Sequence, residues 1–82
     1  MDRTERIIEV LKTVSQQPAA PGRHESLFDS GYLDSFAFPE VIAGLEKEFD
    51  IRIPDSDAHP PKFETIDRMD RYIAQALSNA KS

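Results

Sequence analysis

Ser35 is the strongest candidate in this sequence for a residue with a chemical role. It follows Asp34 in a loop that also holds Asp29, Ser30 and Gly31, and it precedes a segment with the apolar spacing of a helix. Because Ser and Asp side chains accept hydrogen bonds from the first N–H groups of a helix, Ser35 could be a simple N-cap. Its surroundings must therefore decide whether it does more than cap.

No other group of residues offers competing chemistry. His24 and His59 lie in separate loops without metal-ligand spacing, and there is no cysteine. The acids of residues 55–57 lack the glycine and further acids of a calcium loop, so we expect them to cap a short turn. A hydrolase that used Ser35 would need a general base, which the sequence does not supply. We therefore expect neither an enzyme nor a metal site.

The negative charge is concentrated around Ser35. Residues 25–57 contain two basic and nine acidic side chains, a balance of −7, whereas residues 1–24 and 58–82 each carry +1. Such a field repels nucleic acid and anionic lipid and attracts basic protein surfaces. This favours a protein-docking surface, although a solvated face of a small domain remains the alternative.

The chain of 82 residues is expected to form one domain, 1–82, with an ordered core over about 3–78. The N-terminal segment is charged and no run approaches 18 apolar residues, so we expect a cytoplasmic protein without a membrane segment. Asp2 begins a capping box, which predicts a helix from about Arg3 to Gln17 that Pro18 and Pro21 end. Leu27 and Phe28 should fold the following long loop back onto the core.

The second predicted helix has one apolar face and one candidate contact face. At 100° per residue, the apolar face groups Phe38, Val41, Ile42, Leu45 and Phe49. The opposite face groups Phe36, Glu40, Ala43 and Lys47, with Glu46 and Glu48 at its edges. An aromatic ring off the core stripe, beside Ser35, indicates a partner contact, unless Phe36 tucks under the preceding loop.

Pro39 and Gly44 are unusual residues for this helix. With Ser35 as N-cap, Pro39 would fall where the first intrahelical N–H is needed, so either Phe36 is the cap or one backbone bond is missing. Gly44 costs about 1 kcal/mol relative to alanine in a helix, and it would permit another backbone to approach closely.

The last third of the chain predicts an extended linker and one more helix. Ile51 and Ile53 should cover the core in extended conformation, and a single helical turn can start at Pro60 or Pro61. Thr65 is a good N-cap for a final helix, which should fray from Asn79. Its core face comprises Ile66, Met69, Ile73, Ala76 and Leu77, with Tyr72 at the side. The fold class is therefore all-α: a small antiparallel bundle of three main helices and one short helical turn, with a long loop between the first two helices.

These motifs together resemble the acyl carrier and peptidyl carrier protein family. The likeness extends from Ile7 to Leu77 and rests on LFDSGYLDSF (27–36), Val41-Ile42, Leu45-Glu46, Phe49, Ile51-Arg52-Ile53-Pro54 and Phe63-Glu64-Thr65-Ile66. Phe36 stands where the family has Leu or Met, and Pro39 is atypical. Gly31 lies four residues before the serine, which is similar to D-alanyl carriers and stand-alone carriers of specialised biosynthesis.

The resemblance implies a non-catalytic carrier. Ser35 would bear a covalent 4′-phosphopantetheine arm derived from coenzyme A, and Asp34 would be read by the phosphopantetheinyl transferase. The arm would hold an acyl or aminoacyl thioester for a loading ligase and a downstream transferase or synthase, and the carrier would be a monomer. The phosphate would meet the favourable charge and free N–H groups of a helix N-terminus. The alternative is an acidic helical interaction module in which Ser35 is only an N-cap.

Overall fold

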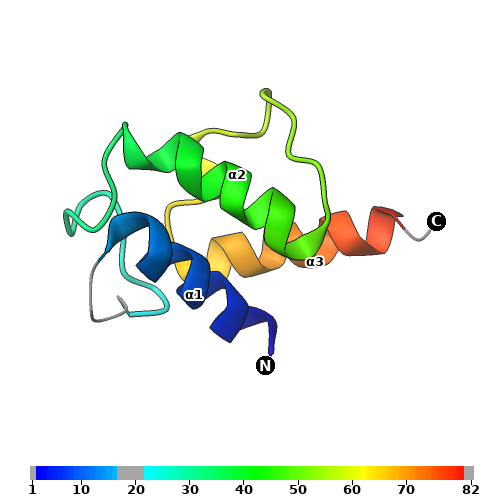
Figure 1. Ribbon diagram of the computed structural model, residues 1–82, viewed down its shortest axis with the longest axis horizontal. Coiled ribbons are helices and arrows are strands. Elements are labelled where there is room, and N and C mark those ends of the chain that lie inside the picture. Colours follow the sequence, from blue (N-terminus) through cyan, green and yellow to red (C-terminus); the bar gives the residue numbers. More distant parts are fainter. Residues whose placement is uncertain (1, 17–21, 81–82) are drawn as a thin grey trace.

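The computed structural model describes residues 2–16 and 22–80 and contains helices without strands in these ranges. The elements are α1 (Arg3–Ser15), α2 (Ala37–Phe49), the 3₁₀ turn η1 (Pro60–Lys62) and α3 (Ile66–Ala80). In Figure 1, α2 and α3 run in the same general direction and α1 runs the opposite way. The all-α prediction and the long loop between the first two helices are confirmed.

The N-terminal helix begins as the sequence predicts and ends slightly earlier. The carboxylate of Asp2 accepts the N–H of Glu5 at 2.9 Å, as an N-cap does. The helix stops at Ser15 because Gln16 adopts a left-handed conformation, with φ of 57°, and its N–H bonds the carbonyl of Lys12. Gln17, Pro18 and Pro21, which belonged to the expected helix end, lie outside the described residues.

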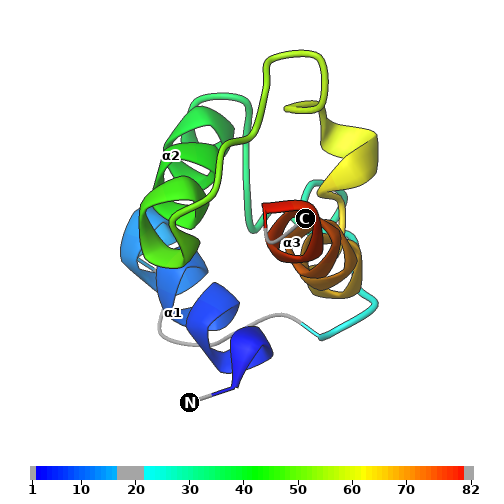
Figure 2. The same cartoon turned by 90° about the vertical axis from the view of Figure 1, so that its right-hand side faces the viewer.

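Helix α2 buries the apolar face that its spacing predicts. Its buried residues are Phe38, Val41, Ile42, Leu45 and Phe49. Gly44 does face a close neighbour, but this neighbour is a side chain and not the backbone that the sequence led us to expect: a Cβ built on Gly44 would lie 2.9 Å from Cγ1 of Val10 on α1. Figure 2 shows α1 and α2 side by side, with the chain after α2 arching over towards α3.

The long loop before α2 is fastened to the start of α3. Leu27 is fully buried, Phe28 packs against the core, and the N–H of Leu27 donates to the carbonyl of Glu64 at 2.8 Å. A second bond runs from the N–H of Asp67 to the carbonyl of Arg23 at 3.1 Å. The expected folding back of this loop is therefore confirmed, and it gives the segment that leads to Ser35 a fixed base.

The C-terminal third also follows the prediction closely. Ile53 is buried in an extended segment, one helical turn starts at Pro60, and the Thr65 hydroxyl accepts the N–H of Arg68 at 3.1 Å. Helix α3 continues to Ala80, and residues 81–82 of the end that we expect to fray lie outside the described residues. The core joins the three helices to the loops. Its buried members are Ile7, Leu11, Leu27, Leu33, Phe38, Val41, Ile42, Leu45, Phe49, Ile53, Phe63, Ile66, Met69 and Ile73.

Candidate functional site

Two buried side chains place Ser35 on an outward corner of the chain. Leu33, only 3% exposed, precedes the corner, and Phe38, 8% exposed, follows it. Between these anchors, Asp34, Ser35 and Phe36 are all exposed. Gly31 makes the turn before the corner at φ of 81°, a conformation that favours glycine. The sequence around Ser35 thus fixes the backbone and leaves the hydroxyl in solvent.

The N-terminus of α2 is capped by the side chain of Asp34, not by that of Ser35. One carboxylate oxygen of Asp34 accepts the N–H groups of Phe36 at 2.9 Å and of Ala37 at 2.8 Å. The Asp34 carbonyl also accepts the N–H of Phe38 at 3.1 Å. Within the described residues, the Ser35 hydroxyl forms no hydrogen bond. The alternative in which Ser35 caps this helix is therefore not what the described residues show, and its hydroxyl is available for another use.

Pro39 explains why the helix proper begins late. With Phe36 in the N-cap position, Pro39 is the third helical residue, where an N–H has no intrahelical partner to lose. In a helix that started earlier, the N–H of residue 39 would bond the Ser35 carbonyl, and proline cannot provide it. Of the two options left by the sequence, the one observed has Phe36 in the N-cap position, while the capping side chain is that of Asp34.

A phosphate attached to Ser35 would point into solvent, because the surrounding residues do not offer it a binding site. A hollow of about 410 Å³ beside the corner is lined by Asp34 and Glu40 and by no Lys or Arg of the described chain. The expectation of free N–H donors is wrong, because Asp34 already takes those of Phe36 and Ala37. The positive end of the α2 dipole remains favourable for an anion. An attached phosphodiester therefore fits here, held by the covalent bond and open to solvent.

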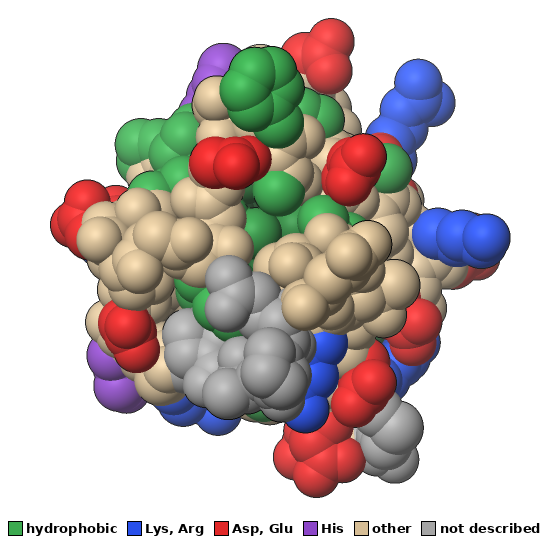
Figure 3. Space-filling view, turned by 60° about the vertical axis from the view of Figure 1, so that its left-hand side comes forward, with side chains coloured by type: hydrophobic (Ala, Val, Ile, Leu, Met, Phe, Trp, Pro, Cys, Tyr) green, Lys and Arg blue, Asp and Glu red, His purple; other side chains and the backbone are tan. Residues whose placement is uncertain are grey.

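The residues of the candidate contact face fall into two groups: some are exposed, and others bond to partners within the chain. Phe36 is 87% exposed, which excludes the alternative that it tucks under the loop. Glu40, Ala43 and Lys47 are exposed as well. Figure 3 shows acidic side chains around hydrophobic ones on the side of the molecule that includes the start of α2.

Glu46 and Glu48, which the sequence placed at the edges of this face, have partners within the chain. The half-buried Glu46 accepts the N–H of Ile53 at 2.8 Å. Glu48 pairs with Arg6 at 2.8 Å, and the Arg6 guanidinium also lies 4.4 Å from the centre of the Phe49 ring. These two acids therefore help to fix the C-terminal end of α2.

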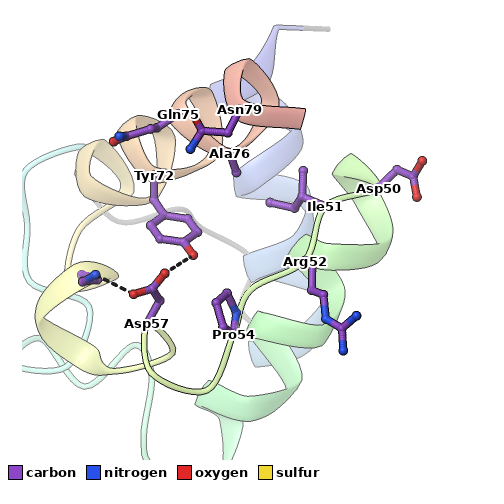
Figure 4. Close-up of a pocket in the computed structure, with 10 residues that line it drawn as sticks. Asp50, Ile51, Arg52, Pro54, Asp57, Tyr72, Gln75, Ala76 and Asn79 are labelled. Atoms are coloured by element: carbon purple, nitrogen blue, oxygen red, sulfur yellow. Dashed lines mark hydrogen bonds and ion pairs between the residues drawn. The ribbon is translucent and has the colours of Figure 1, made fainter. Parts of the chain in front are cut away.

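A second cluster, missed from the sequence, lies between the 50–62 segment and α3. Tyr72 and Asp57 both line a pocket of about 600 Å³. Figure 4 shows their side chains pointing toward each other. The carboxylate of Asp57 accepts from the Tyr72 hydroxyl at 2.8 Å and from the Lys62 ammonium at 2.7 Å. Asp57 thus ties the segment to α3, which corrects the expectation that its side chain caps a turn. Fifteen residues separate the pair, and no local pattern signals it.

Both partners of this contact have shifted pKa values. The hydrogen bonds from Lys62 and then Tyr72 lower the pKa of Asp57 below its ordinary 3.8. Burial, followed by the hydrogen bond to Asp57, raises the pKa of Tyr72 to about 12. Among the described residues, no three Asp, Glu or His side chains gather as metal ligands would. Nor does any helix in that part of the chain have the length and apolar character to cross a membrane.

Comparison with known proteins identifies the family. A family model described as "Phosphopantetheine attachment site" matches residues 5–69. The chain is 33% identical over 80 residues to D-alanyl carrier proteins of Streptococcus sanguinis and Streptococcus gordonii, an alignment of 98% of this chain and 100% of each relative. The D-alanyl carrier protein of Leuconostoc mesenteroides is 30% identical over 69 residues, covering 84% of this chain and 88% of the relative. The chain belongs to the phosphopantetheine-attachment family of carrier proteins, non-catalytic proteins that bear a covalent 4′-phosphopantetheine group.

Proposed function

We propose that Ser35 is the attachment residue of this carrier. The observation that supports it most is the exposed Ser35 hydroxyl, which has no hydrogen-bond partner among residues 2–16 and 22–80 and lies on a corner that buried Leu33 and Phe38 hold in place. When bound, 4′-phosphopantetheine supplies a thiol on which cargo is held as a thioester. The chain itself supplies a rigid platform, and the carrier performs no catalysis of its own.

The test is modification of the purified protein by coenzyme A and a broad-specificity phosphopantetheinyl transferase, followed by intact-mass measurement. We expect one phosphopantetheine on the wild-type chain and none on Ser35→Ala. Ser30→Ala is the matched control, because Ser30 is an exposed serine of the same loop whose hydroxyl bonds the Leu27 carbonyl. An adduct that persists in Ser35→Ala would move the site, and an unmodified wild-type chain would refute the proposal.

The alternative function is an interaction module in which Ser35 is only an N-cap. The cap that the Asp34 side chain provides for α2 argues against it. That alternative assigned the serine a structural purpose, which the carboxylate of Asp34 already serves. It also predicts about 1 kcal/mol of lost stability in Ser35→Ala. We expect urea unfolding of Ser35→Ala to match that of the wild type instead.

We further propose that the cargo is an aminoacyl group in a specialised biosynthetic pathway of the cytoplasm, where coenzyme A is present. The relatives named D-alanyl carrier proteins support this choice. The holo protein should accept D-alanine from a D-alanine-activating ligase with ATP, measured by intact mass. Loading by a fatty-acyl ligase but not by amino-acid ligases would overturn the proposed cargo.

The partners proposed are the phosphopantetheinyl transferase, a loading ligase and a downstream transferase or synthase, which a monomeric carrier would visit in turn. Phe36, Glu40, Ala43 and Lys47 would form the contact face, with Asp34 read by the transferase and Glu46 and Glu48 at its margin. Phe36 offers an exposed ring beside the attachment point, and Glu40 offers charge for a basic patch. Phe36→Ala should raise KM for the transferase and the ligase, while urea unfolding stays unchanged.

A further inference from the structure

Two hollows lie between α1 and α2, which run side by side (Figure 2), and the first of them begins at the corner that carries Ser35. The first hollow measures about 410 Å³ and the second about 220 Å³, and both have Val14 of α1 in their lining. Their α2 residues succeed one another along the helix: Phe36, Ala37 and Glu40 in the first hollow, then Gly44 and Glu48 in the second. The two hollows therefore form one groove, the α1–α2 groove, with one end beside the proposed attachment residue.

The α1–α2 groove follows a single stripe of α2. At 100° per residue, Ala37, Glu40, Gly44 and Glu48 lie within about 80° of one another around the helix. Between Ala37 and Glu48 the helix rises about 16 Å, at 1.5 Å per residue. A phosphopantetheine chain has roughly the length of four to five extended residues, which is about 13 to 18 Å. An arm attached to Ser35 is therefore long enough to lie along the whole groove.

The polar groups that line the groove suit the uncharged part of the arm. Beyond its phosphate, pantetheine carries two methyl groups, a hydroxyl and two amides. The hydroxyls of Thr13 and Ser15 already donate to the carbonyls of Glu9 and Leu11, at 2.9 and 2.7 Å, so their oxygens can still accept hydrogen bonds. The carboxylate of Glu40 forms no ion pair within the described chain. The groove thus offers mainly acceptors, which match the hydroxyl and the two amide N–H groups of the arm.

The apolar part of the lining suits the methyl and methylene groups of the arm. Val10 and Val14 of α1 and Ala37 of α2 are half-buried and pack against the core, so their remaining surface is held in a fixed place. Gly44 contributes no side chain, so nothing from that position interrupts the groove. No Lys or Arg of the described residues lines either hollow, so the phosphate itself finds no cationic partner there.

We propose that the 4′-phosphopantetheine arm rests in the α1–α2 groove between visits to partner enzymes. The inference rests on the proposed attachment at Ser35. The phosphate stays at the exposed corner, and the uncharged part of the arm follows the groove towards Glu48. Ala43 and Lys47 of the contact face lie outside the groove, so a resting arm leaves them accessible to a partner, which then has to draw the arm out.

Amide chemical shifts of the unmodified and the holo protein test this resting place without an enzyme assay. Conversion of wild type to the holo form should move the amide signals of Thr13, Val14 and Gly44 as well as those beside Ser35. Thr13→Phe should block the groove, because Thr13 is exposed, lines the second hollow and lies outside the contact face. Its conversion should leave the Gly44 signal unmoved. Gln75→Phe is the matched control, because Gln75 is exposed on α3 and lines neither hollow.

Alkylation of the arm's thiol by iodoacetamide, followed by intact mass, gives a second readout. A thiol held in the groove reacts only when the arm leaves it, so we expect holo Thr13→Phe to react about twofold faster than wild type or more. Holo Gln75→Phe should react at the wild-type rate. Shift changes confined to residues 33–38 in wild type would overturn the proposal, as would equal thiol rates in wild type and Thr13→Phe. A wild-type chain without an adduct at Ser35 overturns the proposed function, and this inference with it, before either readout is reached.

Discussion

The contact between Gly44 and Val10 offers the sharpest test of how α1 and α2 pack. A Cβ on Gly44 would lie 2.9 Å from Cγ1 of Val10, whereas carbon atoms in ordinary contact lie about 3.5 to 4.0 Å apart. Val10 packs against the core and is β-branched, so its side chain cannot easily rotate away. Gly44→Ala therefore has two opposing effects: the higher helix propensity of alanine stabilises α2, and the steric overlap with Val10 destabilises its packing against α1.

The two effects have comparable sizes. Alanine should gain about 1 kcal/mol over glycine inside a helix. Forcing an extra methyl group into a packed interface costs about 1 to 3 kcal/mol. We expect Gly44→Ala to lower the free energy of unfolding by about 1 kcal/mol, the difference between these terms.

A double-mutant cycle measures the overlap directly, using urea unfolding followed by far-UV circular dichroism. Val10→Ala alone loses packing, but in the Gly44→Ala background it also removes the clash. The double variant should therefore be at least about 1 kcal/mol more stable than the sum of the single changes, outside the usual additivity range of about 0.5 kcal/mol. Ala43→Gly, at the exposed neighbouring position, calibrates the propensity term. Additive single changes, or a Gly44→Ala variant stabilised by the full propensity gain, would refute this description of the interface.

Three further predictions concern the core and the Asp57 cluster. Phe63→Ala removes a fully buried ring 4.9 Å from that of Tyr72, so it should cost about 3 to 5 kcal/mol in urea unfolding. Because the pKa of Tyr72 is raised, the contribution of this side chain to the free energy of unfolding is complete below pH 10 and is lost as pH rises towards 12. The free energy of unfolding measured against pH should show this loss in wild type and not in Tyr72→Phe. Because the pKa of Asp57 is lowered, the contribution of this side chain to the free energy of unfolding is present above pH 3.8 and is lost as pH falls further. In that acidic range, wild type should therefore no longer be more stable than Asp57→Asn. Equal pH profiles of wild type and variant would contradict either titration argument.

The sequence predicts the helices well because each has a local signal. The spacing of Phe38, Val41 and Phe49 suffices to define the buried side of α2, and Thr65 marks the start of α3. The exposed Phe36 was predictable for the same reason, since its angle lies off the apolar stripe. Local periodicity thus determines most of the architecture of a domain this small.

The sequence indicates where the candidate site lies, but it does not predict the hydrogen bonds around it. Asp34 and Ser35 are adjacent and both can cap a helix, so composition alone cannot choose between them. The choice follows from the backbone of the corner, in which the acceptor of Asp34 reaches both N–H groups. The roles of Glu46 and Glu48 were also beyond local reasoning, because Ile53 and Arg6 approach them only in the folded chain.

The division between free and engaged acids follows from the dipole of α2. Near a helix C-terminus, acidic side chains face the negative end of the dipole and are destabilising unless they are paired. Glu46 and Glu48 lie there, and both have intramolecular partners. Glu40 lies in the first turn, where a negative charge is favourable without a partner, and it forms no ion pair within the described chain. Among Glu40, Glu46 and Glu48, the acids of α2, only Glu40 therefore lacks a partner within the described chain, so an incoming basic surface meets unpaired charge at the end of α2 that lies next to Ser35.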